Sequence, residues 1–128
     1  MVLPYMNDND GAIKALKEAL EADPNDFDAN LNLGAVLHTE RDDENARPYL
    51  EKALKLQPSS TLARYEMARV KRSEGKLEEA VKDLEQVIQE RPQWPQPHVE
   101  LAALYFRLNR PKDGERERAV FDQLSSKH

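Results

Sequence analysis

Histidine is the most versatile catalytic and metal-binding side chain, and this 128-residue chain has three of them, His38, His98 and His128. They fall in separate parts of the sequence, and no cysteine is present to complete a metal site or to act as a nucleophile. Neither a glycine-rich phosphate loop nor a Gly-x-Ser-x-Gly turn occurs. The sequence therefore predicts no catalytic residues, no metal site and no cofactor, and it indicates a protein that is not an enzyme.

The acidic run NDNDG at positions 7–11 has a composition typical of a calcium-binding loop. The first and last ligand positions of such a loop need acidic side chains, whereas Met6 and Lys17 would stand there in this sequence. We therefore interpret the run as turn and helix-capping residues.

A basic stretch at positions 61–73 indicates a different chemistry, the binding of carboxylates. It carries four basic residues and one acidic residue. Arg69 and Arg72 lie three positions apart, so they share one face of a helix, and paired guanidinium groups suit carboxylates. The alternative interpretation is that these arginines pair with neighbouring acidic side chains of the same chain.

Composition narrows the classes of partner. The formal net charge is −5 and the pI is about 5.3, whereas a nucleic-acid-binding protein usually shows a basic footprint. No apolar run approaches the roughly 18 residues of a membrane span, and the N-terminus lacks the basic region of a secretory signal. We expect no nucleic-acid binding and no membrane insertion. For the chain as given, the sequence favours a cytoplasmic location without fixing the compartment.

An internal repeat of 34 residues runs along the chain, and such self-similarity is the signature of repeat architectures. Five series of matched residues carry it: Pro24, Pro58 and Pro92; Ala12, Ala46, Ala80 and Gly114; Leu16, Leu50 and Leu84; Ala19, Ala53, Val87 and Phe121; Leu33, Met67 and Leu101. Each proline ends a helical stretch, because proline lacks an amide donor and restricts the residue before it.

Within each repeat, two stretches place apolar residues at the spacing of a helix. Seven helices are expected, at about 9–22, 26–39, 43–56, 60–73, 77–90, 95–108 and 112–125. We expect Asp23 or Asn25 to cap the second helix and Ser59 or Ser60 to cap the fourth. Gly75 is expected to take a positive φ in the turn between the fourth and fifth helices.

Small residues recur where the two helices of a hairpin would have to cross closely. Gly34, Ala68 and Ala102 stand on the first helices, and Ala46 and Ala80 stand on the second helices. We expect buried helix crossings at these positions.

On these residues the chain resembles the tetratricopeptide repeat family, whose pattern is W-x2-L-G-x2-Y, then A-x3-F, then P. The corresponding positions are Asn30, Leu33, Gly34, Leu37, Ala46, Leu50, Ala53 and Pro58 in one repeat, and Arg64, Met67, Ala68, Lys71, Ala80, Leu84, Val87 and Pro92 in the next. The first motif position, usually large and apolar, is polar here. The resemblance implies an all-α fold, a right-handed superhelical solenoid of antiparallel helix hairpins.

The repeat also sets the expected domain organisation, a single tetratricopeptide-like domain over residues 1–128. Residues 9–24 match the second helix of an incomplete repeat, 27–60 and 61–94 are repeats, and 95–128 is a degenerate repeat with a C-terminal capping helix. The residues before position 9 look like a remnant of a missing helix. We therefore hypothesise that the chain is the C-terminal part of a longer array.

The resemblance also implies a binding surface, because the first helices of the family line a concave groove that binds partner segments. The corresponding residues are Leu31, Ala35, His38, Tyr65, Arg69, Arg72, Val99, Ala103 and Phe106, with Arg107 at the rim. We expect a non-catalytic protein–protein interaction module that binds a peptide segment of a protein partner. The alternative is a structural or self-associating section of a larger scaffold, a homo-oligomer formed through the exposed first helix with its Ile13, Leu16 and Leu20.

Overall fold

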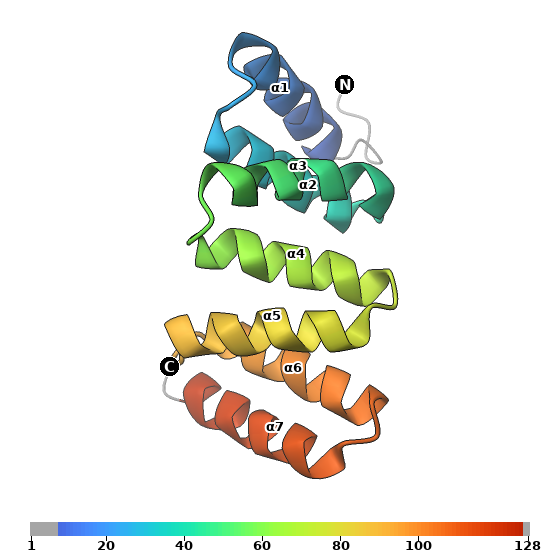
Figure 1. The fold of residues 1–128 in the computed structure, drawn as a ribbon, viewed down its shortest axis with the longest axis vertical. Coiled ribbons are helices and arrows are strands. Elements are labelled where there is room, and N and C mark those ends of the chain that lie inside the picture. The colour runs from blue at the N-terminus through green and yellow to red at the C-terminus, as the bar shows by residue number, and fades with distance from the viewer. Residues whose placement is uncertain (1–7, 127–128) are drawn as a thin grey trace. The chain divides into compact units, whose positions relative to one another are not determined.

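The computed structural model describes residues 8–126, which form seven α-helices joined by short turns (Figure 1). They are α1 (Asp8–Ala22), α2 (Phe27–Thr39), α3 (Asp43–Leu56), α4 (Thr61–Ser73), α5 (Leu77–Glu90), α6 (Pro95–Arg107) and α7 (Pro111–Ser125). All seven predicted helices are present, and each end lies within one residue of its predicted position. Residues 8–11 of the NDNDG run form the first turn of α1 rather than a turn before it, whereas Asn7 and the predicted remnant before it lie outside the described residues.

The chain divides into two compact units, unit 1 (Met1–Glu66) and unit 2 (Met67–His128). In unit 1, α2 packs against both α1 and α3, and in unit 2, α6 packs against both α5 and α7. In the view of Figure 1, α3 lies in front of α2 and α5 lies in front of α6. Each unit is therefore built from antiparallel neighbouring helices, and residues 8–126 contain no strand.

Each unit has its own apolar core, made by the residues of the repeat series. Leu33 of α2 and Leu50 of α3 are fully buried in unit 1. In unit 2, Leu84 of α5 and the two α6 residues Leu101 and Leu104 are buried. Burying one such side chain stabilises a fold by about 1.5–3 kcal/mol, so the matched leucines account for the pairing of the helices.

The α2–α3 crossing is as close as its small residues predict. A Cβ atom placed on Gly34 would lie 2.5 Å from Leu50 Cγ and 3.3 Å from the carbonyl oxygen of Ala46. Ala46 and its repeat equivalent Ala80 are fully buried. The buried Leu50 side chain of α3 therefore leaves no room for a side chain at Gly34, which confirms the predicted close crossing.

The helix starts show one correct and one wrong capping prediction. The Ser60 hydroxyl accepts the backbone N–H of the residue three positions on, at 3.1 Å, as expected for α4. Asp26 caps α2 instead of Asp23 or Asn25, and its carboxylate accepts the N–H of Ala29 at 3.0 Å. The Asp23 carboxylate accepts the N–H of Asn25 at 3.0 Å, within the turn before the helix. The prediction missed Asp26 because three neighbouring polar residues all have capping side chains.

The first motif position carries polar side chains that bond to the recurring prolines. Asn30 Nδ2 donates to the carbonyl oxygen of Pro24 at 3.1 Å, and Arg64 Nη2 donates to that of Pro58 at 3.1 Å. His98 Nε2 donates to the carbonyl oxygen of Pro92 at 2.8 Å. The three donors stand 34 residues apart and so do the three acceptors. Three different side chains thus have the same role, which is to donate a hydrogen bond to the backbone carbonyl group in the turn between repeats.

The turn inside each hairpin also repeats. Arg41, Gly75 and Asn109 stand 34 residues apart and have φ values of 63°, 82° and 60°. The backbone N–H of the next residue donates to a carbonyl five positions earlier in each case, a bond that closes the end of α2, α4 and α6. The prediction for Gly75 is confirmed.

Tyr105 links α6 to α5 by a hydrogen bond that is sensitive to alkaline pH. Its hydroxyl donates to Glu85 Oε2 at 2.7 Å, and the Arg110 guanidinium lies 4.5 Å from the ring centroid. Burial raises the pKa of the Tyr105 hydroxyl above its ordinary value of 10.0, and the hydrogen bond to the Glu85 carboxylate and the negative charge of that carboxylate raise it further. The neutral phenol is therefore favoured in the folded state.

A folded-state pKa above the unfolded value stabilises the protein fully at pH values below the unfolded pKa, and this stabilisation is lost as the pH rises above about 10. We expect the free energy of unfolding to fall more steeply over this alkaline range in the wild type than in Tyr105→Phe. Urea denaturation of both proteins between about pH 8 and 11 measures this difference. Glu85→Gln should reduce the difference, and parallel curves for wild type and Tyr105→Phe would contradict the assignment.

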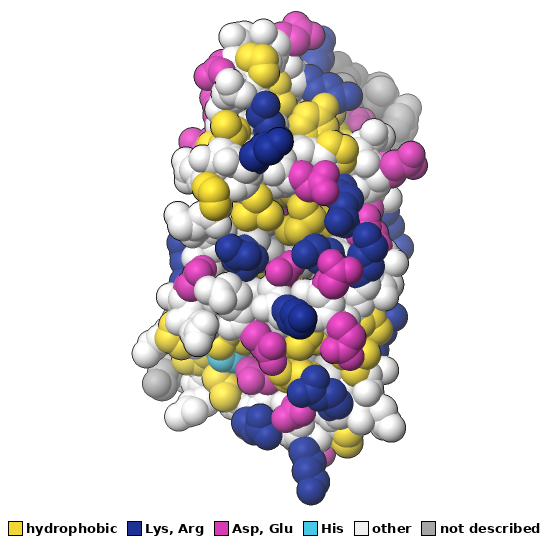
Figure 2. Space-filling model, in the orientation of Figure 1, with side chains coloured by type: hydrophobic (Ala, Val, Ile, Leu, Met, Phe, Trp, Pro, Cys, Tyr) yellow, Lys and Arg dark blue, Asp and Glu magenta, His cyan; other side chains and the backbone are white. Residues whose placement is uncertain are grey.

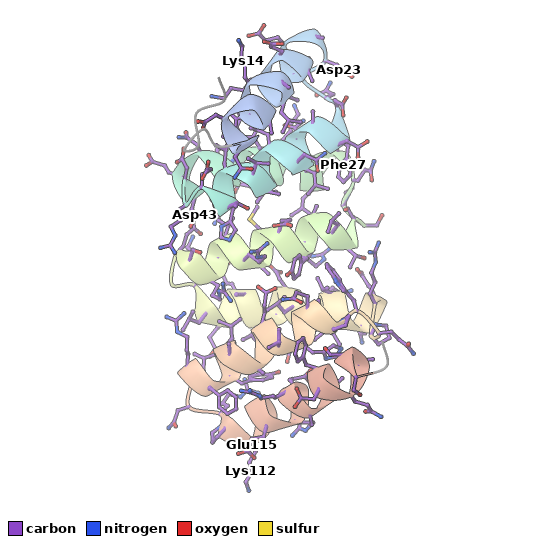
Figure 3. All side chains as sticks on the ribbon, turned by 180° about the vertical axis from the view of Figure 1, so that it is seen from behind. Lys14, Asp23, Phe27, Asp43, Lys112 and Glu115 are labelled. Carbon is purple, nitrogen blue, oxygen red and sulfur yellow. The ribbon has the colours of Figure 1, made fainter. Side chains whose placement is uncertain are left out.

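Polar residues cover the far side of the last helix. Lys112 and Glu115 are exposed and project from α7 on the side away from α6 (Figure 3). Among residues 8–126, no helix is both long enough and apolar enough to cross a membrane.

Candidate functional site

The predicted arginine pair lies against one carboxylate of α6. Arg69 Nε and Arg72 Nη1 are each 3.6 Å from Glu100 Oε1. The side chain of Glu100 is 12% exposed, whereas the side chains of Arg69 and Arg72 are 33% and 34% exposed. The two arginines therefore have an acidic partner in their own chain, which is the alternative interpretation that the sequence left open. About a third of each arginine side chain is still exposed to solvent.

Another basic residue of α4 faces a different helix. Lys71 Nζ lies 2.8 Å from Asp83 Oδ2 and 3.8 Å from Glu79 Oε1, both on α5. This half-buried ion pair joins α4 to α5 within unit 2. Arg69 and Arg72 are thus the basic residues of α4 on the side that faces α6.

The predicted residues of α6 lie one helical turn apart along one face. Val99 is half-buried, and Ala103, Phe106 and Arg107 are exposed. Phe106 is 43% exposed, and its ring packs over Gly114 of α7, where an added Cβ would lie 2.9 Å from the ring atoms. One side of this ring is therefore fixed by packing against α7, while the rest of the ring meets solvent.

The predicted residues of unit 1 are mostly buried. Leu31 and Tyr65 are each 5% exposed and Ala35 is half-buried. His38 is buried, and its Nδ1 atom lies 2.7 Å from Oδ1 of Asp43, at the start of α3 (Figure 3). The three predicted residues that are exposed all belong to α6 in unit 2.

Sequence reasoning missed Glu100, the carboxylate between the arginines. A signal was available, because Glu100 is the only acidic residue of α6, whose sequence is PQPHVELAALYFR. A carboxylate that is the only acidic group of its helix needs a basic partner, and the arginine-rich helix α4 provides two.

Other residue clusters of the described chain offer less. Residues 8–126 contain no group of three or more histidine, cysteine or acidic side chains placed to hold a metal ion. The apolar residues of α1 that were predicted to mediate self-association, Ile13, Leu16 and Leu20, are half-buried.

Comparisons with known proteins agree with the repeat. Models of the tetratricopeptide repeat match residues 3–61 and 62–93. Comparison with the curated proteins gave no match. Among solved structures, MamA 41-end from Desulfovibrio magneticus RS-1 has a TM-score of 0.85 at 21% identity, over 94% of this chain and 68% of that chain. A MamA RS-1 double mutant has a TM-score of 0.84 at 22% identity, over 94% and 67% of the two chains.

These similar structures share the fold, so the predicted fold class, an all-α solenoid of helix hairpins, is confirmed. The two repeat models together span most of the sequence. By its repeat, its helix hairpins and these matches, the chain belongs to the tetratricopeptide repeat family.

Proposed function

We propose that this chain is a non-catalytic protein–protein interaction module that binds an acidic peptide segment of a partner. The proposed surface lies in unit 2 and consists of Arg69 and Arg72 of α4 and Ala103, Phe106 and Arg107 of α6. Membership of a family that generally forms interaction modules supports a binding role over a catalytic one. The arginine pair, one-third exposed and held beside Glu100, is the observation that carries the choice of partner.

Glu100 has a clear physical role in this proposal. Its nearly buried carboxylate lies 3.6 Å from a nitrogen atom of each guanidinium group, so its charge attracts both groups toward one position before a partner arrives. A surface that is already ordered loses less conformational entropy on binding. About a third of each arginine side chain remains exposed, and a carboxylate of the partner would form charge-assisted hydrogen bonds with these exposed guanidinium groups.

Apolar contact would supply the remaining affinity. Phe106 is one of the large apolar side chains of the described chain that remains exposed, at 43%. An aromatic ring anchored on one side is a typical contact point for a partner side chain. A single short segment that uses the arginine pair and this ring would bind in the micromolar range, about −8 kcal/mol.

The experiment compares peptide binding by the wild type and by Arg69→Gln/Arg72→Gln. An array of synthetic peptides that vary in acidic and aromatic residues is probed with each full-length protein. We expect the wild type to retain acidic peptides. The double variant should bind them at least roughly tenfold more weakly, because each charge-assisted hydrogen bond contributes about 1.5–3 kcal/mol.

The matched control is Lys82→Gln/Lys112→Gln, which removes two positive charges from exposed positions of α5 and α7. It should bind as the wild type does, which separates a local effect from one of net charge. Circular dichroism checks that each variant keeps its helices. An unchanged peptide profile for a folded Arg69→Gln/Arg72→Gln protein would reject the proposed surface.

A further inference from the structure

Unit 1 has an open hollow of about 260 Å³ between its three complete helices. Its lining residues come from α1, the following turn, α2 and α3, and they are Leu20, Pro24, Asn30, Pro48, Tyr49 and Lys52. A second hollow of about 370 Å³ shares Leu20 and Tyr49 with it. Figure 2 shows hydrophobic and charged side chains of both signs side by side on the face of α1 and α3 that is turned to the viewer. The two hollows therefore adjoin at Leu20 and Tyr49, and the second one is also lined by Lys17 and Glu21 of α1.

The size of Asn30 explains why the hollow is open. At the same position of the later repeats the chain has the longer side chains Arg64 and His98. The Asn30 amide folds back to donate to the carbonyl groups of Pro24 and Asp26, at 3.1 Å and 2.9 Å. It satisfies the turn, as its longer equivalents do, but it leaves the space beside Tyr49 unfilled.

The walls of the hollow are apolar and its edge is positively charged. Leu20, the two prolines and the Tyr49 ring provide carbon surface, and Lys52 is the only charged side chain among the described residues that line the hollow of about 260 Å³. Lys52 is half-buried, and it forms no ion pair within residues 8–126. A half-buried ammonium group without a carboxylate is unfavourable, so an anionic group brought beside it would be stabilised.

We propose that this hollow is a second binding site, one that takes an aromatic side chain of an acidic partner segment. The ring lies on Leu20 and Tyr49, and a neighbouring carboxylate of the partner pairs with Lys52. The site shares no residue with the surface of α4 and α6 in unit 2, so either can fail without the other.

Two other hollows carry no such inference. One of about 580 Å³ is lined by α3 residues alone, and one of about 450 Å³ is lined by the α5 residues that stand 34 positions later. They recur with the repeat and each is lined by one helix alone. We therefore interpret them as ordinary features of the exposed surface of the second helix of a hairpin. The hollow at Asn30 differs because three helices and a turn close around it.

Nuclear magnetic resonance of the ¹⁵N-labelled full chain tests the proposal. The probe is the peptide acetyl-Glu-Asp-Phe-Asp-Glu-amide, titrated into the Arg69→Gln/Arg72→Gln protein so that only the second site is available. We expect saturable shifts of the backbone amides of Leu20, Tyr49 and Lys52. The same peptide with alanine in place of phenylalanine should bind roughly tenfold more weakly, because it cannot fill the hollow.

Three variants on this background locate the binding. Asn30→His introduces the side chain that the chain itself uses at the equivalent position, keeps a donor for Pro24, and fills the space, so peptide affinity should fall roughly tenfold. Lys52→Gln should also weaken binding, and it serves alone if Asn30→His does not fold. Lys55→Gln, one turn further along α3 and outside the hollow at Asn30, should leave the affinity unchanged.

Three outcomes would overturn the proposal. The first is the absence of saturable shifts at the hollow. The second is binding that Asn30→His and Lys52→Gln both leave unchanged. The third is that the same amides shift with increasing protein concentration in the absence of peptide, since the occupant would then be a second copy of this chain.

Discussion

Gly34→Ala is expected to lower the free energy of unfolding by roughly 1–3 kcal/mol, the cost of inserting a methyl group into a packed helix crossing. The added Cβ would lie 2.5 Å and 2.6 Å from two carbon atoms of Leu50, which is itself fully buried. Leu50 cannot move away freely, and the Ala46 carbonyl oxygen at 3.3 Å limits movement of α2 along the crossing. The helices therefore have to separate slightly, and core contacts are lost on both sides.

Gly11→Ala is the matched control for this substitution. Gly11 is also helical, but it is exposed in the first turns of α1, and an added Cβ would meet nothing within 4 Å. Alanine there should stabilise the protein by about 0.5–1 kcal/mol through helix propensity alone. Urea denaturation followed by circular dichroism measures both variants. Equal effects of the two substitutions would show that the α2–α3 crossing is looser than the distances indicate.

A double-mutant cycle identifies the atoms responsible. Shortening Leu50 to alanine removes the two carbon atoms that the new Cβ approaches. Leu50→Ala alone should cost about 2–5 kcal/mol, as for a buried leucine. In the Leu50→Ala background, Gly34→Ala should cost less than it does in the wild type, and additive costs would mean that the backbone at Ala46 is the obstacle.

The helices could be predicted from the sequence because their signal is periodic. Leu33, Leu50 and Leu84 recur with the spacing of the repeat, and burial of one member implies burial of the others. The small residues Gly34 and Ala46 likewise predicted a close crossing, since small side chains at matching positions of two helices have few other uses. Such patterns predict the helices and their crossing because each hairpin packs in the same way, so equivalent positions of the repeat need similar side chains.

The hairpin turns were harder to predict, because one backbone shape is made by different residues. Only Gly75 indicates a positive φ by its identity, while Arg41 and Asn109 adopt the same conformation without a glycine. The turn bonds that close α2, α4 and α6 impose this shape on whatever residue stands there. The repeat period could have transferred the prediction from Gly75 to its two equivalents.

The polar residues at the first motif position did not match the family pattern. Their role depends on backbone atoms, which a pattern of side chains does not describe. Asn30, Arg64 and His98 bond to backbone carbonyl groups, which every residue has. Glu100 was missed for a related reason, because its partners Arg69 and Arg72 belong to another helix. Contacts between helices depend on the rotation of each helix, which the sequence period defines only approximately.

His98 of α6 uses both nitrogens of its ring, one to bond to the turn before α6 and one to contact α7. Its Nε2 atom lies 2.8 Å from the Pro92 carbonyl oxygen, and its Nδ1 atom lies 2.7 Å from Glu117 Oε1 on α7. A carbonyl oxygen only accepts, so Nε2 carries a hydrogen. The contact with Glu117 then needs a second proton, on the ring or on the carboxyl group. The His98 side chain is 5% exposed and that of Glu117 is 18% exposed, so water replaces neither bond readily.

His98→Ala should therefore lower the free energy of unfolding by roughly 2–4 kcal/mol, because two partly or fully buried acceptors lose their donor and a small cavity forms. His98→Asn, which copies the residue of the first repeat, should keep the bond to Pro92 and lose only the one to Glu117, at an intermediate cost. Arg118→Ala, an exposed neighbour of Glu117 on α7, is the control and should change stability by less than about 0.5 kcal/mol. Thermal and urea unfolding of the three variants measure the order of their free energies of unfolding. If His98→Asn were as destabilising as His98→Ala, the bond to the Pro92 carbonyl would contribute nothing, and the common role assigned to Asn30, Arg64 and His98 would be wrong.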